Sequence, residues 1–400
     1  MSTVVMIWLD AFSSRYLDPQ KTPFISELYR SGLHTYLESL FAFSGVGVSA
    51  LTGTRINTHK VWSDCILRKS KSPPSIFKWL LRLCDHIPDD ILSQYAGNII
   101  RRIFRYNPGI PNLIPVELVD FFDTKEEKRL TDENPVRGIT TLFDQLRECK
   151  VKYLTTGLYE SILEQWIVKK ALKAMDEDYR FILLKLGSLD RLGHKYGPES
   201  KEVPSKLGEI DRMVREVVER GVESGASAHF VIFSDHGMTP ITKHVNLMKI
   251  LEGLPVKMRQ DYIVFLNSTV ASFWFNNERA KELIVEELET IEEGIILDNA
   301  KLKELEIDEI GSEYGDLLFA LKAGNVFFPD FYRKRKPPKG MHGYAFSTYD
   351  KPPFIIYSPD TSYKLQPGVK AELIDVMPTI LDLLALPVPA TCEGKSLLKR

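Results

Sequence analysis

Two short stretches of the chain combine carboxylates with imidazoles, the side chains that bind divalent metal ions. The segment 187–198 presents Asp190 and, four residues later, His194, so both can reach one ion if the segment is helical. Asp235 and His236 stand side by side before Gly237. Either pair is a weak signal alone, but together they indicate a site for a metal ion.

Apolar runs precede these residues and predict the elements that position them. Val4–Leu9 lead into Asp10, residues 181–184 lead into the Asp190 segment, and residues 230–233 lead into Asp235. Short apolar runs of this kind are typical of buried strands. Because open parallel sheets bind their ligands outside the carboxyl ends of the strands, we expect all three segments to meet at one site.

A serine before two glycines supplies a candidate nucleophile. Ser44 opens the sequence Ser-Gly-Val-Gly-Val, which predicts a turn from strand to helix that exposes a hydroxyl and free backbone N–H groups. Ser44 could equally be the N-cap of that helix, or serve in both roles. Ser49 is a weaker alternative because it falls one turn inside the predicted helix.

His342 completes a set of three carboxylates and three imidazoles. It follows the basic run 333–336, which is either a solvated loop or a means of steering an anionic substrate to the site. Two divalent cations need about this number of ligands, and mixed nitrogen and oxygen donors suit zinc, with manganese or iron as alternatives. The predicted ligands are Asp10, Asp190, His194, Asp235, His236 and His342.

Strand and helix patterns alternate along the chain and predict an α/β fold with a mostly parallel central sheet flanked by helices. We expect residues 1–400 to form a single catalytic domain. Two stretches depart from the alternation: 66–138, which predicts a helical insertion, and 245–337, which predicts a smaller α+β insertion.

The helical insertion is open to three interpretations. Apolar residues such as Trp79, Leu83, Ile99 and Ile103 recur at helical spacing, with arginines and lysines among them. An ordinary amphipathic pair packed on the core is the first interpretation. A lid over the substrate and a surface that approaches lipid headgroups are the others.

Charge and cysteine content limit the function classes. A net charge of -2 argues against a nucleic acid polymer as partner. The four cysteines are scattered without C-x-x-C spacing, which favours reduced thiols and a cytoplasmic location. The first residues do not resemble a signal peptide, and no apolar run reaches the length of a membrane span. The oligomeric state is not predicted.

The order of these motifs resembles the alkaline phosphatase superfamily. Two motifs, Asp-x-x-Gly-His-x-x-Gly-Pro from Asp190 and Ser-Asp-His-Gly-Met around Asp235, are similar to those of the type I phosphodiesterase/nucleotide pyrophosphatase branch. The resemblance implies that Asp190, His194 and His342 hold one metal ion. It implies that Asp10, Asp235 and His236 hold a second ion, to which Ser44 is also bound.

The resemblance further implies a hydrolase of small phosphate esters, most readily phosphodiesters, that works through a phosphoseryl intermediate. Members of the branch usually have a threonine nucleophile followed closely by Pro-Asn, whereas here Gly45 and Val46 follow Ser44. The N–H groups of Gly45 and Val46 are therefore the candidates for binding the phosphoryl oxygen. A phosphomonoesterase, a phosphonate hydrolase or a sulfatase-type relative is the alternative, and a non-catalytic protein that binds an anionic surface is a hypothesis from another class.

Overall fold

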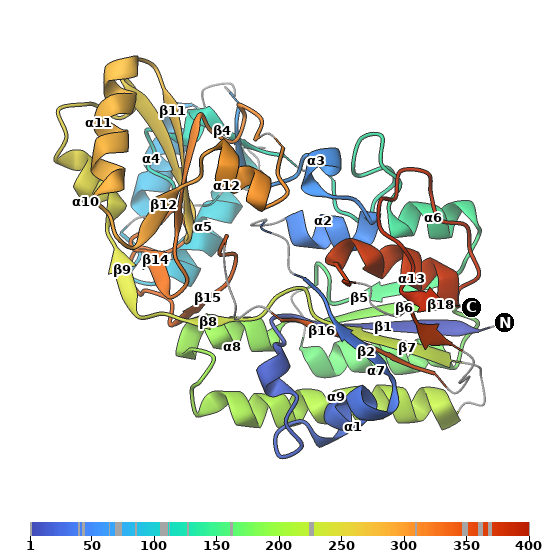
Figure 1. Ribbon diagram of the computed structural model, residues 1–400. Coiled ribbons are helices and arrows are strands. Elements are labelled where there is room, and N and C mark those ends of the chain that lie inside the picture. The colour runs from blue at the N-terminus through green and yellow to red at the C-terminus, as the bar shows by residue number, and fades with distance from the viewer. Residues whose placement is uncertain are drawn as a thin grey trace.

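A computed structural model describes most of the chain, and its elements form two lobes joined side by side (Figure 1). The larger lobe holds both termini. None of the described helices is long and apolar enough to cross a membrane. The described residues are 2–38, 41, 45–63, 65–68, 74–84, 86–104, 111, 113–125, 128–160, 163–223, 228–308, 310–345, 351–358, 363–366 and 370–399.

A six-stranded sheet forms the centre of the larger lobe. Its order is β2-β16-β7-β1-β6-β5, and only β16 runs antiparallel to its neighbours among these strands. β1, at the middle of the sheet, pairs in parallel with β6 and β7. The strands span Thr3–Leu9 (β1), Leu33–Tyr36 (β2), Tyr153–Thr156 (β5), Phe181–Leu186 (β6), Ala228–Phe233 (β7) and Pro353–Tyr357 (β16).

Helices cover both faces of this sheet, because β1 is apolar on both sides. Val4, Met6 and Trp8 point into one apolar cluster, while Val5 and Ile7 point into another. This arrangement confirms the predicted mostly parallel sheet flanked by helices (Figure 1). The first cluster is shared with α2 (Gly45–Thr52), α6 (Leu142–Glu148) and α13 (Val376–Leu383), and the second with α1 (Pro23–Ser31), α7 (Glu164–Met175) and α9 (Glu202–Glu223).

The smaller lobe is built on an antiparallel sheet in the order β10-β11-β13-β12. Its strands span Tyr262–Leu266 (β10), Val270–Phe275 (β11), Gly294–Ile296 (β12) and Leu317–Leu321 (β13). Its helices are α4 (Ser75–Cys84), α5 (Asp90–Ile103), α10 (Leu247–Glu252), α11 (Glu278–Glu289) and α12 (Asn299–Glu304).

The two predicted insertions pack against each other in this lobe. Phe122, from the first insertion, lies 5.1 Å from Phe265 and 5.7 Å from Trp274 between ring centroids. Leu118 belongs to the same buried cluster. The boundaries 66–138 and 245–337 stay predictions, but residues from both stretches share one apolar core.

The start of α1 is fixed by a contact from a distant helix. Pro23 occupies the first turn, but the Thr22 side chain does not cap the helix. Thr22 donates instead to the carbonyl oxygen of Tyr16. Asp211, from α9, accepts from the backbone N–H groups of Phe24 and Ile25 at 3.2 and 2.8 Å. A carboxylate from a distant helix thus replaces the local cap.

Candidate active site

The predicted metal ligands lie at the carboxyl ends of neighbouring strands. Asp10 follows β1, and Asp235 and His236 follow β7. Asp190 and His194 both lie in α8 (Ser188–Tyr196), which begins directly after β6. His342 follows β15 (Gly340–Met341), which pairs with β8 (Thr239–Pro240) and so lies beside the segment after β7 (Figure 1).

The helical turn of α8 is what brings Asp190 and His194 together. Gly193 lies inside the helix, and a Cβ there would approach the Met238 side chain at 3.0 Å. Its role is therefore close packing. Gly197 ends the helix at φ +92°, a conformation that favours glycine.

A first group of ligands is formed by Asp190, His194 and His342. Asp190 Oδ1 lies 3.4 Å from His194 Nε2 and 3.4 Å from His342 Nε2. One ligand atom from each of the three residues lies within 4.8 Å of the others. The side chains that the family resemblance assigns to one ion thus have their donor atoms grouped around one point.

A second group adjoins the first and differs in one member from the predicted set. Asp10, Asp190 and His236 have donor atoms within 4.8 Å of one another, so Asp190 faces both groups. His236 Nε2 lies 3.4 Å from Asp10 Oδ1 and 3.6 Å from Asp235 Oδ2. The His236 and His342 rings stack with centroids 3.7 Å apart.

Backbone carbonyls assign the tautomers of two of these histidines. His194 Nδ1 lies 2.9 Å from Gly340 O, and His236 Nδ1 lies 3.0 Å from Gly237 O. A carbonyl oxygen can only accept, so Nδ1 carries the proton in each ring. Nε2 then faces the carboxylates, and it is the nitrogen that would bind a metal ion after giving up any proton that it carries.

Three carboxylates lie close together at this edge and perturb each other: Asp235 is buried, and Asp10 and Asp190 are partly buried. Burial and the charge of Asp235 raise the pKa of Asp10 to about 6. Burial opposes the charge of His236, but Asp235, Asp10 and Asp190 outweigh it and raise the pKa of His236 to about 9. Burial and His236 lower the pKa of His342 to about 4. Such an acidic, buried cluster fits one or two bound dications.

Lys185 is a component of the site that the sequence analysis missed. Its Nζ lies 2.8 Å from Asp10 Oδ2 and 4.2 Å from the centroid of the Trp8 ring. Burial opposes its charge, but Asp10 and Asp235 outweigh it and raise the lysine pKa above its ordinary value. The signal was one lysine within the apolar strand β6, at the register position opposite Trp8.

Ser44, the predicted nucleophile, lies outside the described residues, but the helix after it is described. α2 begins at Gly45, so the N–H groups of Gly45 and Val46 are in its first turn and lack intrahelical partners. A Cβ at Gly47 would lie 3.4 Å from Trp8 Cη2, at the end of the strand that leads to Asp10. The start of α2 therefore packs against the strand end that carries the ligands.

Ser49 is a core residue in the structure. It is fully buried, and its Oγ lies 2.9 Å from His59 Nε2. His59 Nδ1 accepts from the Val61 N–H at 3.0 Å, so Nε2 carries the proton and donates to Ser49. His59 therefore cannot take a proton from Ser49 through Nε2, and the pair serves packing.

Arg333, the first residue of the basic run 333–336, is close enough to the site for its charge to affect His194. Burial is the largest cause that lowers the pKa of His194, and the charge of Arg333 contributes to the same shift. Arg333 Nη1 donates to Ser268 Oγ at 3.1 Å, which holds the guanidinium on the smaller lobe. The Arg333 charge acts both on the His194 side of the site and on the buried carboxylate of Asp330, whose pKa is raised by burial and lowered by Arg333.

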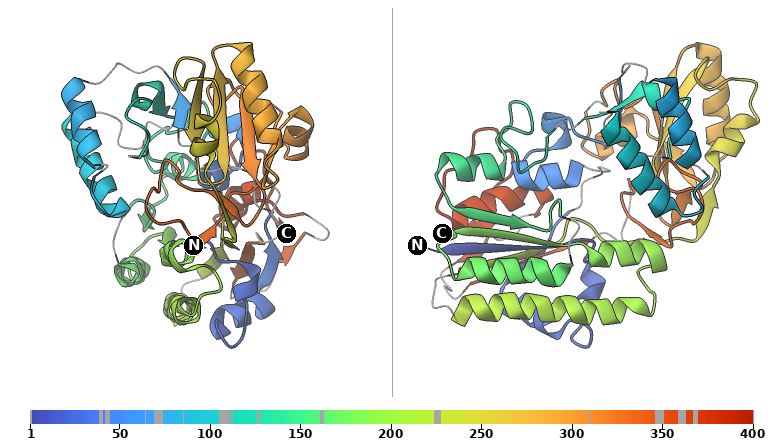
Figure 2. Two further views of the ribbon diagram at one scale, coloured as in Figure 1. Left: turned by 90° about the vertical axis from the view of Figure 1, so that its left-hand side faces the viewer. Right: turned by 180° about the vertical axis from the view of Figure 1, so that it is seen from behind.

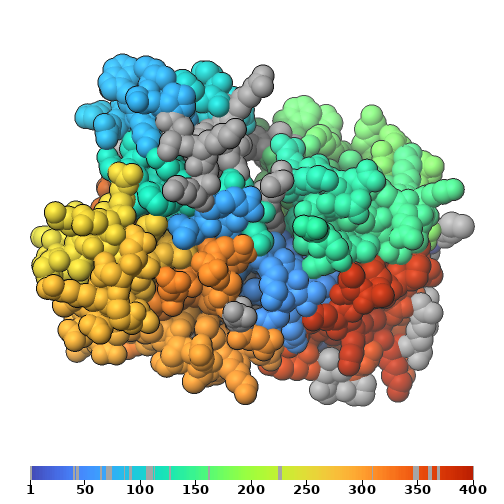
Figure 3. Space-filling model, turned by 90° about the horizontal axis from the view of Figure 1, so that it is seen from above, coloured from blue at the N-terminus to red at the C-terminus, as the bar shows by residue number. Residues whose placement is uncertain are grey.

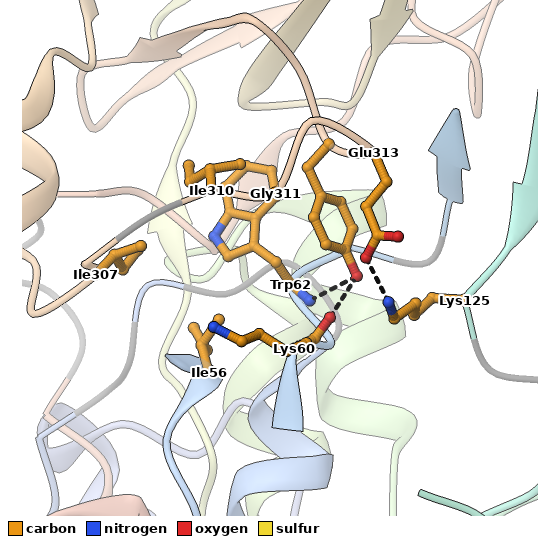
Figure 4. A pocket seen from close by; sticks show the side chains of 9 residues that line it. Ile56, Lys60, Trp62, Lys125, Ile307, Ile310, Gly311 and Glu313 are labelled. Carbon is orange, nitrogen blue, oxygen red and sulfur yellow. Dashed lines mark hydrogen bonds and ion pairs between the residues drawn. The ribbon is translucent and has the colours of Figure 1, made fainter. Parts of the chain in front are cut away.

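A cavity of about 100 Å³ lies between α3 (Ile56–His59) and the loop after α12 (Figure 4). Tyr314 closes one side by donating to the Lys60 carbonyl oxygen at 2.7 Å, and Lys125 pairs with Glu313. None of the predicted metal ligands lines this cavity. It is therefore separate from the cluster at the sheet edge.

The family model for type I phosphodiesterase/nucleotide pyrophosphatase matches residues 130–345, more than half of the chain. The chain belongs to this family. The match includes five of the six predicted ligands and ends just after His342. It confirms the resemblance on which the ligand assignments were based.

Curated members of the family match over shorter stretches. Ectonucleotide pyrophosphatase/phosphodiesterase family member 7 of Mus musculus is 40% identical over 72 residues, which is 17% of this chain and 16% of the relative. Ectonucleotide pyrophosphatase/phosphodiesterase 1 of Saccharomyces cerevisiae is 30% identical over 100 residues, 23% of this chain and 14% of the relative. These alignments thus span less than a fifth of each relative's own length.

Solved structures of the family share the whole fold. Human ectonucleotide pyrophosphatase/phosphodiesterase 5 superposes with a TM-score of 0.70 at 14% identity and covers 100% of both chains. An inactive variant of the murine protein in complex with AMP superposes with a TM-score of 0.69 at 14% identity, again over 100% of both chains. The likeness therefore includes both lobes.

Proposed function

We propose that this protein is a metal-dependent phosphoric ester hydrolase that cleaves phosphodiesters through a phosphoseryl intermediate on Ser44. The observation that carries the proposal is the convergence of six carboxylate and imidazole ligands at the sheet edge, where α2 begins one residue after Ser44. Membership of the type I phosphodiesterase/nucleotide pyrophosphatase family supports it.

The ligand set would hold two divalent metal ions. Asp190, His194 and His342 would hold one ion, and Asp10, Asp235 and His236 would hold the other together with Ser44. Mixed nitrogen and oxygen donors favour zinc, with manganese or iron as alternatives. When bound, the two ions would supply positive charge that lowers the pKa of the serine hydroxyl and stabilises the leaving oxygen.

The chain's own residues would carry the two displacements. Ser44 Oγ loses its proton and attacks phosphorus in line, so that the Oγ–P bond forms while the bond to the leaving alcohol breaks and that oxygen gains a proton. Water then attacks the phosphorus of this seryl ester, which still carries the second ester group. The Oγ–P bond breaks, Ser44 Oγ regains a proton, and a phosphate monoester leaves. The N–H groups of Gly45 and Val46 would donate to a phosphoryl oxygen in both steps. Lys185, bonded to Asp10, would hold that carboxylate in place.

A nucleotide or another small phosphodiester is the proposed substrate. The AMP complex of the murine relative supports a nucleotide, and Arg333 supplies a positive charge for the phosphate. A monoesterase, phosphonate hydrolase or sulfatase-type activity is the alternative, because one site of this kind can serve several tetrahedral centres. Comparing rates on diester, monoester and sulfate esters of p-nitrophenol would separate them.

The test of the nucleophile is Ser44→Ala, with Ser49→Ala as its matched control. With zinc or manganese present, we expect Ser44→Ala to lower bis-p-nitrophenyl phosphate hydrolysis by roughly 10³-fold or more, because an attacking hydroxyl is lost. Ser49→Ala removes a buried hydroxyl bonded to His59 and should leave turnover near that of the wild type. Undiminished hydrolysis by Ser44→Ala would remove Ser44 from this role.

We also propose a cytoplasmic location. Cys149 and Cys392 carry free thiols, which supports a reducing compartment. Fractionation of the source cells, with antibody detection, would test it, and recovery of the protein outside the cytoplasm would contradict it.

A further inference from the structure

Exposed apolar side chains are concentrated on two segments of the molecule. Fourteen large apolar or aromatic residues among those described are exposed, and ten of them come from α4, α5, the first turn of α7 and the residues just before it. A solvated monomer scatters such residues singly, whereas a concentration of them marks an interaction surface.

α4 is apolar on two opposite sides. Phe77 and Leu81 are buried against the rest of the smaller lobe. Ile76, Trp79 and Leu83 have the spacing i, i+3, i+7 of one helix face and are exposed, with 53% of Trp79 accessible. The spacing that predicted packing on the core therefore describes a face that the described chain leaves open.

α5 repeats the pattern beside it. Its exposed residues, again at helical spacing, end with Ile103, which is 70% accessible. The two helices lie next to each other at the outer edge of the smaller lobe (Figures 2 and 3). The exposed apolar residues of α5 are Leu92, Tyr95, Ile99 and Ile103.

The start of α7 adds a third apolar group on the larger lobe. Trp166 lies in the first turn of α7 and is 55% accessible, and Tyr159 and Leu163, which precede the helix, are also exposed. α7 and the α4–α5 pair lie on the same side of the molecule, which the right-hand view of Figure 2 turns toward the reader. Of the five tryptophans, Trp79 and Trp166 are the two that are exposed.

The charges beside these groups are basic side chains, some of which are paired with acids. The sequence 68–105 contains eight basic and three acidic residues, but three of the basic residues form ion pairs with acids outside it: Arg68 with Asp123, Lys78 with Asp120 and Arg82 with Glu117. Within it Arg82 and Arg102 are exposed, although Arg101 is buried. On α7, Lys169, Lys170 and Lys173 are exposed next to Trp166, and Lys169 lies 5.0 Å from its ring.

We propose that this surface, formed by α4, α5 and the start of α7, docks on an anionic lipid bilayer. Tryptophan and tyrosine prefer the boundary between headgroups and acyl chains, and lysine and arginine bind anionic headgroups. Helices of this kind lie in the plane of the interface and do not span it. The proposal does not rest on the hydrolase activity, because it uses none of the residues of the active site.

Vesicle cosedimentation of the full-length protein tests the proposal. We expect binding to vesicles of phosphatidylcholine with 30% phosphatidylglycerol, as a chosen probe, and weaker binding to phosphatidylcholine alone or at high salt. The variant Trp79→Glu with Trp166→Glu should lower the partition coefficient at least about tenfold, since two apolar anchors are replaced by charges that the anionic surface repels. Brominated acyl chains should quench wild-type tryptophan fluorescence and quench this variant much less.

The control variant is Val222→Glu with Val388→Glu, which places the same charges at two exposed apolar positions outside this surface. It should bind as the wild type does. Absence of wild-type binding to the anionic vesicles at low salt would overturn the proposal. So would a wild-type dimer that Trp79→Glu dissociates without any vesicle binding, because the surface would then be an interface between copies of the chain.

Discussion

The carboxyl edge of the central sheet and the α4–α5 pair both invert the usual distribution of side chains. At the sheet edge Asp10, Asp190 and Asp235 are packed together and largely buried, whereas on the helical pair Trp79 and Tyr95 face solvent. Buried like charges need a compensating charge, and exposed apolar groups need a cover. Each inversion thus supports one of the two proposals: bound cations at the first region and a lipid surface at the second.

The largest expected effect comes from Asp190, which faces both ligand groups. Asp190→Asn keeps the size of the side chain but removes the charge, so we expect loss of bound metal and a fall of roughly 10³-fold or more in phosphodiesterase turnover. Elemental analysis of the purified protein measures the first effect and a steady-state assay the second.

Asp178→Asn is the matched control for this change. Asp178 is an exposed carboxylate that pairs with Lys152 on the surface of the larger lobe. The control should keep full metal content and activity. If Asp190→Asn also kept them, the buried carboxylates would not be explained by bound cations.

The next effect compares two aromatic residues of α4. Phe77 is fully buried, so Phe77→Ala should lower the free energy of unfolding by about 3–5 kcal/mol. Trp79 is exposed, so Trp79→Ala should change it by no more than about 0.5 kcal/mol. Urea unfolding followed by circular dichroism measures both. A large loss for Trp79→Ala would mean that the chain itself covers this face.

The smallest expected effect, about 2 kcal/mol between pH 6.5 and 5, tests whether every buried polar group in the larger lobe marks a cation site. Burial lowers the pKa of His59 to about 3, and its partners are Ser49 and the Val61 N–H. The unfolded chain, with an ordinary histidine pKa near 6.5, therefore binds the proton more readily. The free energy of unfolding should fall by about 1.4 kcal/mol per pH unit as the pH drops below about 6.5, and level off near pH 3.

His59→Gln removes the titrating imidazole. The free energy of unfolding should then fall less steeply between pH 6.5 and 5, as measured by urea unfolding at a series of pH values. Its metal content should equal that of the wild type, since His59 belongs to neither ligand group. The same pH slope in both proteins would show that His59 does not contribute, and loss of metal would link it to the site.

Much of the active site could be predicted from the sequence because its ligands follow buried strands directly. Asp10 and Asp235 come immediately or shortly after apolar runs, and strand ends of a parallel sheet have to meet. The position of Asp190 between two groups could not be predicted, because it depends on how α8 is oriented after β6. Lys185 was missed since a single polar residue in a strand is typical of a solvated side chain.

For α4 and α5 the sequence predicted the helices but not which of their faces is buried. The spacing of apolar residues predicted helices in this stretch, and the structure contains them. Periodicity alone could not show which face of α4 is buried, because Phe77 and Leu81 are apolar on one side while Ile76 and Trp79 are apolar on the other. Only the placement of Val116 and Val119 against Phe77 and Leu81 decides the question.

The strand order of the larger lobe has a consequence for synthesis on the ribosome. β2 lies at the edge of the sheet and pairs with β16, which is made more than 300 residues later and separates it from β7. A nascent chain can align β1, β5, β6 and β7, but its β2 segment has no strand to join until Pro353–Tyr357 emerge from the exit tunnel. The pairing of β2 and β16 with the rest of the sheet is thus a late event, and by then His342 has already been translated.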